Sequence, residues 1–124
     1  MKNGFWVILI FLLSCSSDRA VTFKPKIIDG KIDLSSQIVG NWDKVCILGP
    51  YTLEPNASEI LGFESDVLDR SDISGDDTIT LLVVLQGQSI TGLYEVPRGH
   101  ADFTKLGSGC FNRKSAKFKV ASNA

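Results

Sequence analysis

Few side chains in this 124-residue sequence could carry out metal or nucleophilic chemistry. There are three cysteines and a single histidine, His100. The cysteines lack the C-x-x-C spacing of redox and zinc sites, and one histidine adds little to a ligand set. His100 has no evident partner for general-base catalysis, and Leu106 stands where a nucleophile elbow around Ser108 needs glycine. The sequence therefore predicts no catalytic residue, no metal site and no cofactor, and we expect the protein not to be an enzyme.

The amino terminus has the layout of an export signal. Residues 1–4 are short and polar with one lysine, and residues 5–13 are uninterruptedly apolar. Such a run, if helical, covers about 14 Å, roughly half of a hydrocarbon core of about 30 Å. A permanent transmembrane helix is therefore not expected.

The apolar run ends at Leu12-Leu13-Ser14-Cys15, which resembles the lipobox of bacterial lipoproteins. The resemblance implies removal of residues 1–14, a diacylglycerol on the Cys15 sulfur and an acyl chain on the new amino terminus. Several acyl chains meet the two-signal requirement for stable anchoring. We therefore expect a lipid-anchored envelope protein. Because Ser16 rather than Asp follows the cysteine, we expect it on the outer membrane facing the periplasm if the host is Gram-negative. A conventional signal peptide with an incidental cysteine is the alternative.

Export changes the expected role of the two remaining cysteines. Cys46 and Cys110 would meet an oxidising compartment, in which disulfides persist. A bridge between them would enclose roughly 65 residues and contribute about 4 kcal/mol in the chain-entropy model. We expect residues 15–26 to be the lipidated cysteine and a tether, and residues 27–124 to form a single domain that this disulfide stabilises.

Composition and charge exclude one class of partner. The chain is 44% hydrophobic and 22% charged, as in ordinary globular proteins. Its formal charge of -1 provides no strong field to hold a phosphate backbone. Nucleic acid is therefore not an expected partner.

Several segments have the pattern of β-strands. Residues 42–48 are rich in β-forming types, and alternation would place Trp42 on the same face as Cys46. Residues 78–85 suit a central buried strand, and residues 89–96 return after a turn, which predicts a hairpin. Further strands are expected around Cys110 and over residues 116–120, where lysines alternate outward.

One short helix is predicted over residues 56–62. Asn56 can cap its first turn, Glu59 can reach back to complete a capping box, and Gly62 can end it in the left-handed conformation. Ile60 and Leu61 would then pack on the sheet. The expected fold class is α+β, with a small antiparallel β-sheet, one short helix and one disulfide.

Aromatic and basic side chains are the candidates for partner binding. The segment from Trp42 to Tyr51 matches W-D-x-V-C-x-x-G-P-Y and resembles a stretch of small, uncharacterised bacterial lipoproteins, a resemblance that implies no known activity. Trp42 and Tyr51 would form a partner-facing pair, unless Trp42 belongs to the core. The basic carboxyl-terminal region could meet anionic lipid headgroups or an acidic protein, or simply be an outward strand face. Its basic residues are Arg98, Lys105, Arg113, Lys114, Lys117 and Lys119.

The charge balance reverses in the middle of the chain. Residues 54–77 contain eight carboxylates and a single basic residue, Arg70. Calcium takes six to eight oxygens, but the D-x-D-x-D-G register of an EF-hand loop is absent. A solvated acidic face is therefore expected.

These features favour a small lipid-anchored envelope protein that binds rather than catalyses. It would be an accessory or inhibitor module acting on another envelope component and tied to the membrane through Cys15. Two alternatives remain open: a prophage-type exclusion lipoprotein that masks an outer-membrane receptor, and a small hydrolase. Some lysozyme inhibitors are also small disulfide-bearing lipoproteins, but their motifs are not matched here.

Overall fold

The computed structural model describes residues 18–120. The predicted signal segment and Cys15 lie outside the described residues. Within residues 18–120, no helix combines the length and the apolar character needed to cross a bilayer.

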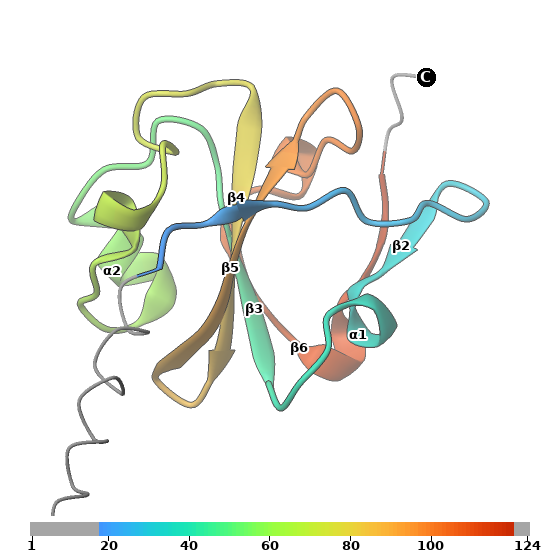
Figure 1. Cartoon of the computed structure of the whole chain (residues 1–124), viewed down its shortest axis with the longest axis horizontal. Helices are drawn as coiled ribbons and strands as arrows, with labels where there is room; N and C mark the ends of the chain where they lie inside the picture. Colours follow the sequence, from blue (N-terminus) through green and yellow to red (C-terminus); the bar gives the residue numbers. More distant parts are fainter. Residues whose placement is uncertain (1–17, 121–124) are drawn as a thin grey trace, which may run out of the picture.

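A five-stranded sheet forms the centre of the domain (Figure 1). Its strand order is β1-β5-β4-β3-β6; β1 pairs parallel with β5 and the other neighbours are antiparallel. The strands are β1 (Val21–Thr22), β3 (Lys44–Leu48), β4 (Ile79–Gln86), β5 (Ser89–Pro97) and β6 (Gly109–Asn112). All of β4 except Gln86 is buried, and β4 and β5 form a hairpin. The predicted central strand and hairpin are both confirmed.

Smaller elements surround this sheet. A separate antiparallel ribbon consists of β2 (Lys31–Asp33) and β7 (Lys117–Lys119). The remaining elements are α1 (Leu34–Gln37), α2 (Asn56–Leu61), and the 3-10 turns η2 (Val67–Arg70), η3 (Thr104–Leu106) and η4 (Arg113–Ser115). The α+β class with a sheet and a disulfide is confirmed, although there are two short α-helices where one was predicted. The lysines of β7 point outward as predicted, but its partner is β2 and not the main sheet.

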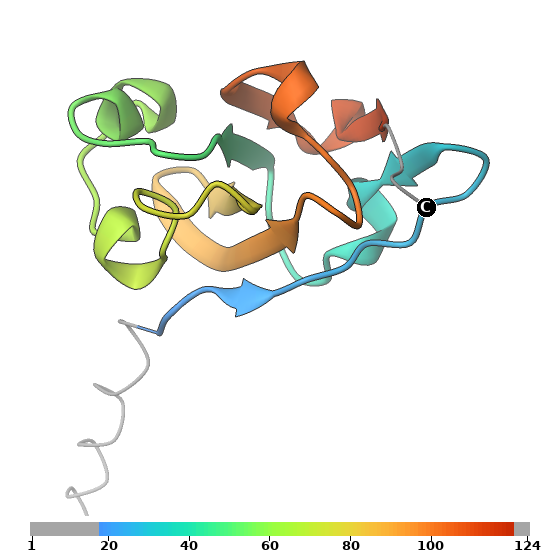
Figure 2. The ribbon, with the colours of Figure 1, turned by 90° about the horizontal axis from the view of Figure 1, so that it is seen from above.

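The sheet is covered on both faces by different layers (Figure 2). We call α2 and η2 the helical layer, and β2, α1, η4 and β7 the ribbon layer. Val45 and Ile47 of β3 pack toward the ribbon layer, whereas Cys46 and Leu48 pack toward the helical layer, as strand alternation requires. Trp42 packs with Val45 and not with Cys46, so the predicted shared face is wrong. The reason is that β3 begins at Lys44, and strand alternation does not extend back to Trp42.

The disulfide joins two neighbouring strands. Cys46 of β3 and Cys110 of β6 are direct partners in the antiparallel register, and their sulfurs are bonded at 2.02 Å. The predicted bridge is therefore confirmed, and it fastens β3 to β6, a strand near the carboxyl terminus.

The folded domain begins earlier in the chain than residue 27, the predicted boundary. Val21 and Thr22 pair with Tyr94 and Glu95 of β5. The ring of Phe23 lies 5.2 Å from that of Tyr94, centroid to centroid, and Pro25 is buried. Residues 21–26 are thus part of the domain and not of a tether. A two-residue strand is too short to show the alternation by which a strand is recognised in a sequence.

Helix α2 confirms one predicted end and corrects the other. Gly62 ends it with a φ of 89°, in the left-handed region. At its start, however, no side chain of the cap position accepts a hydrogen bond. The carboxylate of Glu54 instead accepts hydrogen bonds from the backbone N–H and the hydroxyl of Ser58, at 3.0 and 2.8 Å. The predicted cap by Asn56 is wrong because Asn56 is itself the first residue of the helix.

Candidate functional site

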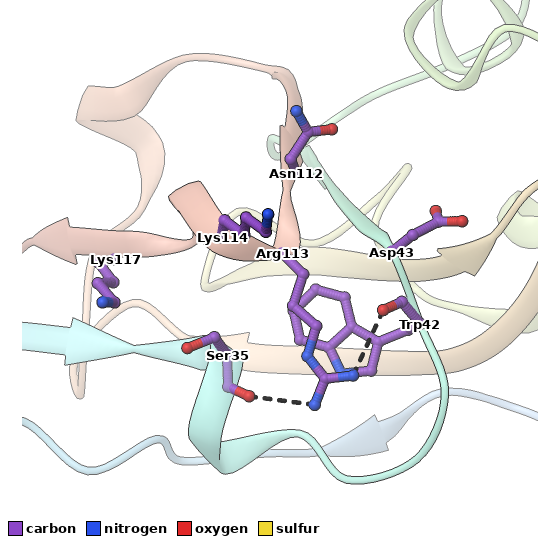
Figure 3. A pocket seen from close by; sticks show the side chains of 7 residues that line it. All are labelled: Ser35, Trp42, Asp43, Asn112, Arg113, Lys114 and Lys117. Carbon is purple, nitrogen blue, oxygen red and sulfur yellow. Dashed lines mark hydrogen bonds between the residues drawn. The ribbon is translucent and has the colours of Figure 1, made fainter.

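A cleft beside Trp42 lies between the ribbon layer and the start of β3 (Figure 3). We call it the indole cleft. Its volume is about 800 Å³. Seven residues line it: Ser35, Trp42, Asp43, Asn112, Arg113, Lys114 and Lys117.

Arg113 and Trp42 form the fixed part of this cleft. The guanidinium carbon of Arg113 lies 4.6 Å from the centroid of the indole, a cation–π contact in which Figure 3 shows the Arg113 side chain overlying the indole. The indole N–H of Trp42 donates to the carbonyl of Ile38 at 2.9 Å. Both side chains are therefore held in one orientation before any ligand arrives.

The guanidinium of Arg113 also ties three segments together. Its Nη1 donates to the carbonyls of Gly40 and Trp42, at 2.9 and 3.3 Å, and its Nη2 donates to that of Ser35 at 3.2 Å. Its backbone N–H donates to the carbonyl of Asp43, which extends the pairing of β6 with β3. These partners are all carbonyl groups, and Arg113 forms no salt bridge with a carboxylate among residues 18–120. The cleft is thus aromatic and cationic, a combination that suits non-covalent recognition of anionic groups.

A second hollow adjoins the first across α1. We call it the ribbon hollow; its volume is about 500 Å³. Lys117 lines both hollows. The other residues of the ribbon hollow are Lys26, Ile28, Lys31, Ile32, Asp33, Ser36 and Gln37.

Gln37 fixes one wall of the ribbon hollow. Its side-chain oxygen accepts from the backbone N–H of Lys26 at 2.6 Å, and its amide nitrogen donates to the Lys26 carbonyl at 3.1 Å. This pair of hydrogen bonds holds the segment before β2 against α1. This wall of the hollow is therefore fixed by hydrogen bonds between a side chain and the backbone.

Asp33 is the carboxylate in the ribbon hollow, and it has a structural role. Its Oδ1 accepts from the backbone N–H of Ser35 at 3.0 Å and from the Ser35 hydroxyl, which caps α1. The hydrogen bond from the Ser35 hydroxyl, and the positive charge of Lys117 to a smaller extent, lower the pKa of Asp33 below its ordinary value. Asp33 is therefore ionised at neutral pH.

The structure separates the two predicted aromatic residues. Trp42 is only 5% exposed and belongs to the core, whereas Tyr51 is 58% exposed. Trp42 precedes β3 and Tyr51 follows it, so they lie at opposite ends of that strand. The prediction of a partner-facing Trp42–Tyr51 pair is therefore wrong, and the alternative prediction, that Trp42 belongs to the core, is correct. The negative charge of Asp77 raises the pKa of the Tyr51 phenol.

The predicted basic residues divide into two groups. Lys117 lines both hollows, and Lys119 follows it outward on β7. Arg98 lies elsewhere: it pairs with Asp102 at 3.2 Å and donates to the Asp77 carbonyl at 2.7 Å. Arg98 therefore holds loops at the end of β5 and does not line either hollow.

Sequence reasoning missed the contribution of the amino-terminal segment to this site. Lys26, Lys31 and Ser35 line the hollows with carboxyl-terminal residues. The pairing of β2 with β7 brings these segments together across most of the chain. The only signal in the sequence was the mixture of apolar and basic types in residues 21–31.

The structure places His100 and Ser108 in different surroundings. The His100 Nε2 lies 2.6 Å from the carbonyl oxygen of Pro25, so it donates a hydrogen bond there. Ser108 is exposed in the loop before β6. Among residues 18–120, no group of three or more His, Cys, Asp or Glu side chains is placed to hold a metal ion.

Comparison of the chain with protein-family models, with curated proteins and with solved structures finds no match.

Proposed function

We propose that this chain is a small lipid-anchored protein of the bacterial cell envelope that binds another envelope component and does not catalyse a reaction. The observation that carries the proposal is the Cys46–Cys110 bridge between directly paired strands. Such a bridge persists in an oxidising compartment, where the export signal would deliver the chain. The lipobox-like sequence ending at Cys15 supplies the anchor.

The indole cleft supports a binding role. Its central charge, on Arg113, is fixed by carbonyl groups and by the indole of Trp42, so the surface is organised without a ligand. Preorganised surfaces bind with a smaller loss of conformational entropy. The cationic side chains around the cleft would recognise charge on a partner.

Intact mass spectrometry of the membrane fraction of expressing cells tests the proposal. We expect a mass equal to residues 15–124 plus acyl groups, and two thiols that can be alkylated only after reduction. A Cys15→Ser variant is the matched control, because it keeps the fold and the Cys46–Cys110 pair but cannot accept the thioether-linked lipid. A wild-type protein without lipid, or with thiols that react before reduction, would contradict the proposal.

A further inference from the structure

Two lysines lie directly opposite each other on the ribbon. Lys31 of β2 and Lys119 of β7 are direct partners in the antiparallel register, and both are exposed. Like charges in this position destabilise a strand pair. Two residues further along β2, Asp33 lies opposite Lys117, so that pair combines opposite charges. The ribbon could therefore accommodate a pair of opposite charges at Lys31 and Lys119 as well. When a fold keeps a destabilising like-charge pair without an evident compensating gain inside the fold, the pair indicates a functional surface.

This pair belongs to a larger cationic face. We define the cationic face as Lys26, Lys31, Lys114, Lys117 and Lys119. Lys117 joins its parts, because it lines both hollows and neighbours Lys119 on β7. The salt bridges among residues 18–120 are Arg19–Asp72, Arg70–Asp66 and Arg98–Asp102, and none of them involves a lysine.

The five lysines of the face outnumber the three carboxylates near it, which are Asp29, Asp33 and Asp43. Asp33 caps α1 through Ser35, and Asp43 accepts from the backbone N–H of Gly87 at 3.1 Å. Asp29 lies exposed in the turn before β2. Residues 113–119 add four cations and no carboxylate. The face therefore keeps a positive charge that an anionic partner would neutralise.

The face also presents apolar surface. Ile28 is 68% exposed at the edge of the ribbon hollow, and the buried Ile32 contributes to the lining of the same hollow. Protein interfaces combine an apolar centre with a polar rim. A hollow that combines the exposed Ile28 with three lysines fits an apolar side chain flanked by carboxylates better than it fits a purely ionic polymer.

The position of the face relative to the anchor excludes one source of negative charge. The chain enters the domain at η2, where Arg70 donates to the Asp18 carbonyl at 2.7 Å and Arg19 pairs with Asp72 at 3.0 Å. Only Ser16 and Ser17 separate Asp18 from Cys15, a span of at most about 10 Å. The ribbon lies at the other end of the long axis of the domain (Figures 1 and 2). An anchored domain would therefore hold its cationic face away from its own membrane.

We infer that the cationic face binds an acidic protein segment that inserts an apolar side chain into the ribbon hollow on the membrane-distal side of the domain. The orientation of the face away from the membrane rests on the proposed lipid anchor. The affinity for the acidic segment rests on the face itself, through charge complementarity around the ribbon hollow.

A peptide titration tests this inference on the full, membrane-inserted chain. The protein is held in nanodiscs of phosphatidylcholine, and the probe is a fluorescent peptide with one leucine flanked by glutamates. We expect Lys31→Glu with Lys119→Glu to weaken binding by about tenfold or more, since two charge contacts are reversed. This double variant keeps a like-charge pair on the ribbon, so its stability stays close to that of the wild type. Lys105→Glu, an exposed lysine on η3 outside both hollows, should change the affinity by less than about twofold.

The single variant Lys31→Glu separates a binding role from a structural one. It creates an opposite-charge pair with Lys119, so we expect a higher unfolding midpoint together with weaker peptide binding. A replacement of the peptide leucine by serine should also weaken binding. Equal affinity of the wild type and the double variant, or of the two peptides, would overturn the inference.

The lipid composition tests the orientation. We expect the peptide affinity to stay the same when the nanodiscs contain phosphatidylglycerol. A loss of peptide binding on these anionic discs would overturn the inference, because the face would then lie on lipid headgroups. Intact mass of the same preparation reports the Cys15 lipid separately, so a failure of the anchor is distinguishable from a failure of the face.

Discussion

The helical layer and the ribbon layer cover opposite faces of one sheet but use their charges differently. In the helical layer and the segments next to it, carboxylates have partners within the domain: Asp72 pairs with Arg19, and Asp66 with Arg70. Asp76 accepts from the backbone N–H of Thr78 at 2.8 Å. In the ribbon layer, Lys31 and Lys119 oppose each other. In the first region the charges hold the chain together, whereas in the second Arg113 and Asp33 do so and the lysines, which form none of the salt bridges among residues 18–120, remain for a partner.

The comparison separates surface charge from function. The acidic segment is the most conspicuous charge feature of the sequence, yet its described ion pairs fasten the entering chain and η2. The cationic face is assembled from two distant segments and is less visible in the sequence. Net charge along a chain is therefore a weaker guide to a binding surface than the partners that each charge has in the fold.

The largest effect is expected from removing the aromatic centre of the ribbon layer. Phe118 is 7% exposed, and its ring makes edge-to-face contacts with Phe103 and Phe111, at centroid distances of 5.8 and 5.0 Å. Phe118→Ala should lower the free energy of unfolding by about 3–5 kcal/mol. Denaturant titration measures it, with Val39→Ala at an exposed position expected to change the value by less than about 0.5 kcal/mol. A small effect of Phe118→Ala would mean that the ribbon does not depend on this contact.

The disulfide should matter next, and mainly for the other layer. Cys46 packs in the core under the helical layer, and the Cys110 sulfur lies 3.1 Å from the Ile60 carbonyl oxygen. Replacing both cysteines with alanine should lower the free energy of unfolding by about 2–4 kcal/mol. Peptide affinity at the cationic face, measured under conditions where the variant remains folded, should be unchanged. A loss of affinity there would break the separation between the two layers.

Arg113 offers a test of the indole cleft. Arg113→Lys keeps the charge but cannot reproduce the planar stack on Trp42 or the hydrogen bonds to three carbonyls. We expect a loss of about 1–3 kcal/mol in the free energy of unfolding, because the half-buried carbonyls of Trp42 and Ser35 lose their donor. Lys114→Arg, at the neighbouring exposed position, is the control and should have no comparable effect. Equal stability of the wild type and Arg113→Lys would show that charge alone is sufficient.

The smallest effect is a pH dependence at the start of α1. Hydrogen bonds from Ser35 hold the pKa of Asp33 below its ordinary value of 3.8. The folded state thus favours the carboxylate, and this stabilisation is present above pH 3.8 and is lost as the pH falls through the lowered pKa. Asp33→Asn should lower the unfolding midpoint at pH 6 and much less at pH 2.5. A difference that persists at low pH would mean that the carboxylate charge does not contribute.

Local patterns in the sequence were sufficient to predict the central strands but neither β1 nor the site. The apolar run of β4, the turn at Gly87 and the helix end at Gly62 each depend on neighbouring residues, and each is confirmed. The Cys46–Cys110 bridge followed from the count of cysteines and the export signal. The pairing of Lys31 with Lys119 depends on a register between distant strands, which no local pattern encodes. The face on which Trp42 lies depends on where β3 begins. The ends of a strand are the feature that a sequence predicts least well.

The central claim is that the anchored domain holds its helical layer near the membrane and its cationic face away from it. Fluorescence energy transfer to labelled lipid tests this claim most directly. A fluorescent amino acid is placed at exposed Asp69 of η2 or at exposed Asp29 before β2, in the full chain on vesicles with an acceptor on the lipid headgroups. Neither position disturbs the disulfide, and Cys15→Ser is the unanchored control. The account predicts efficient transfer from position 69, weak transfer from position 29 and none from the control. Transfer from position 29 that equals or exceeds that from position 69 would contradict it.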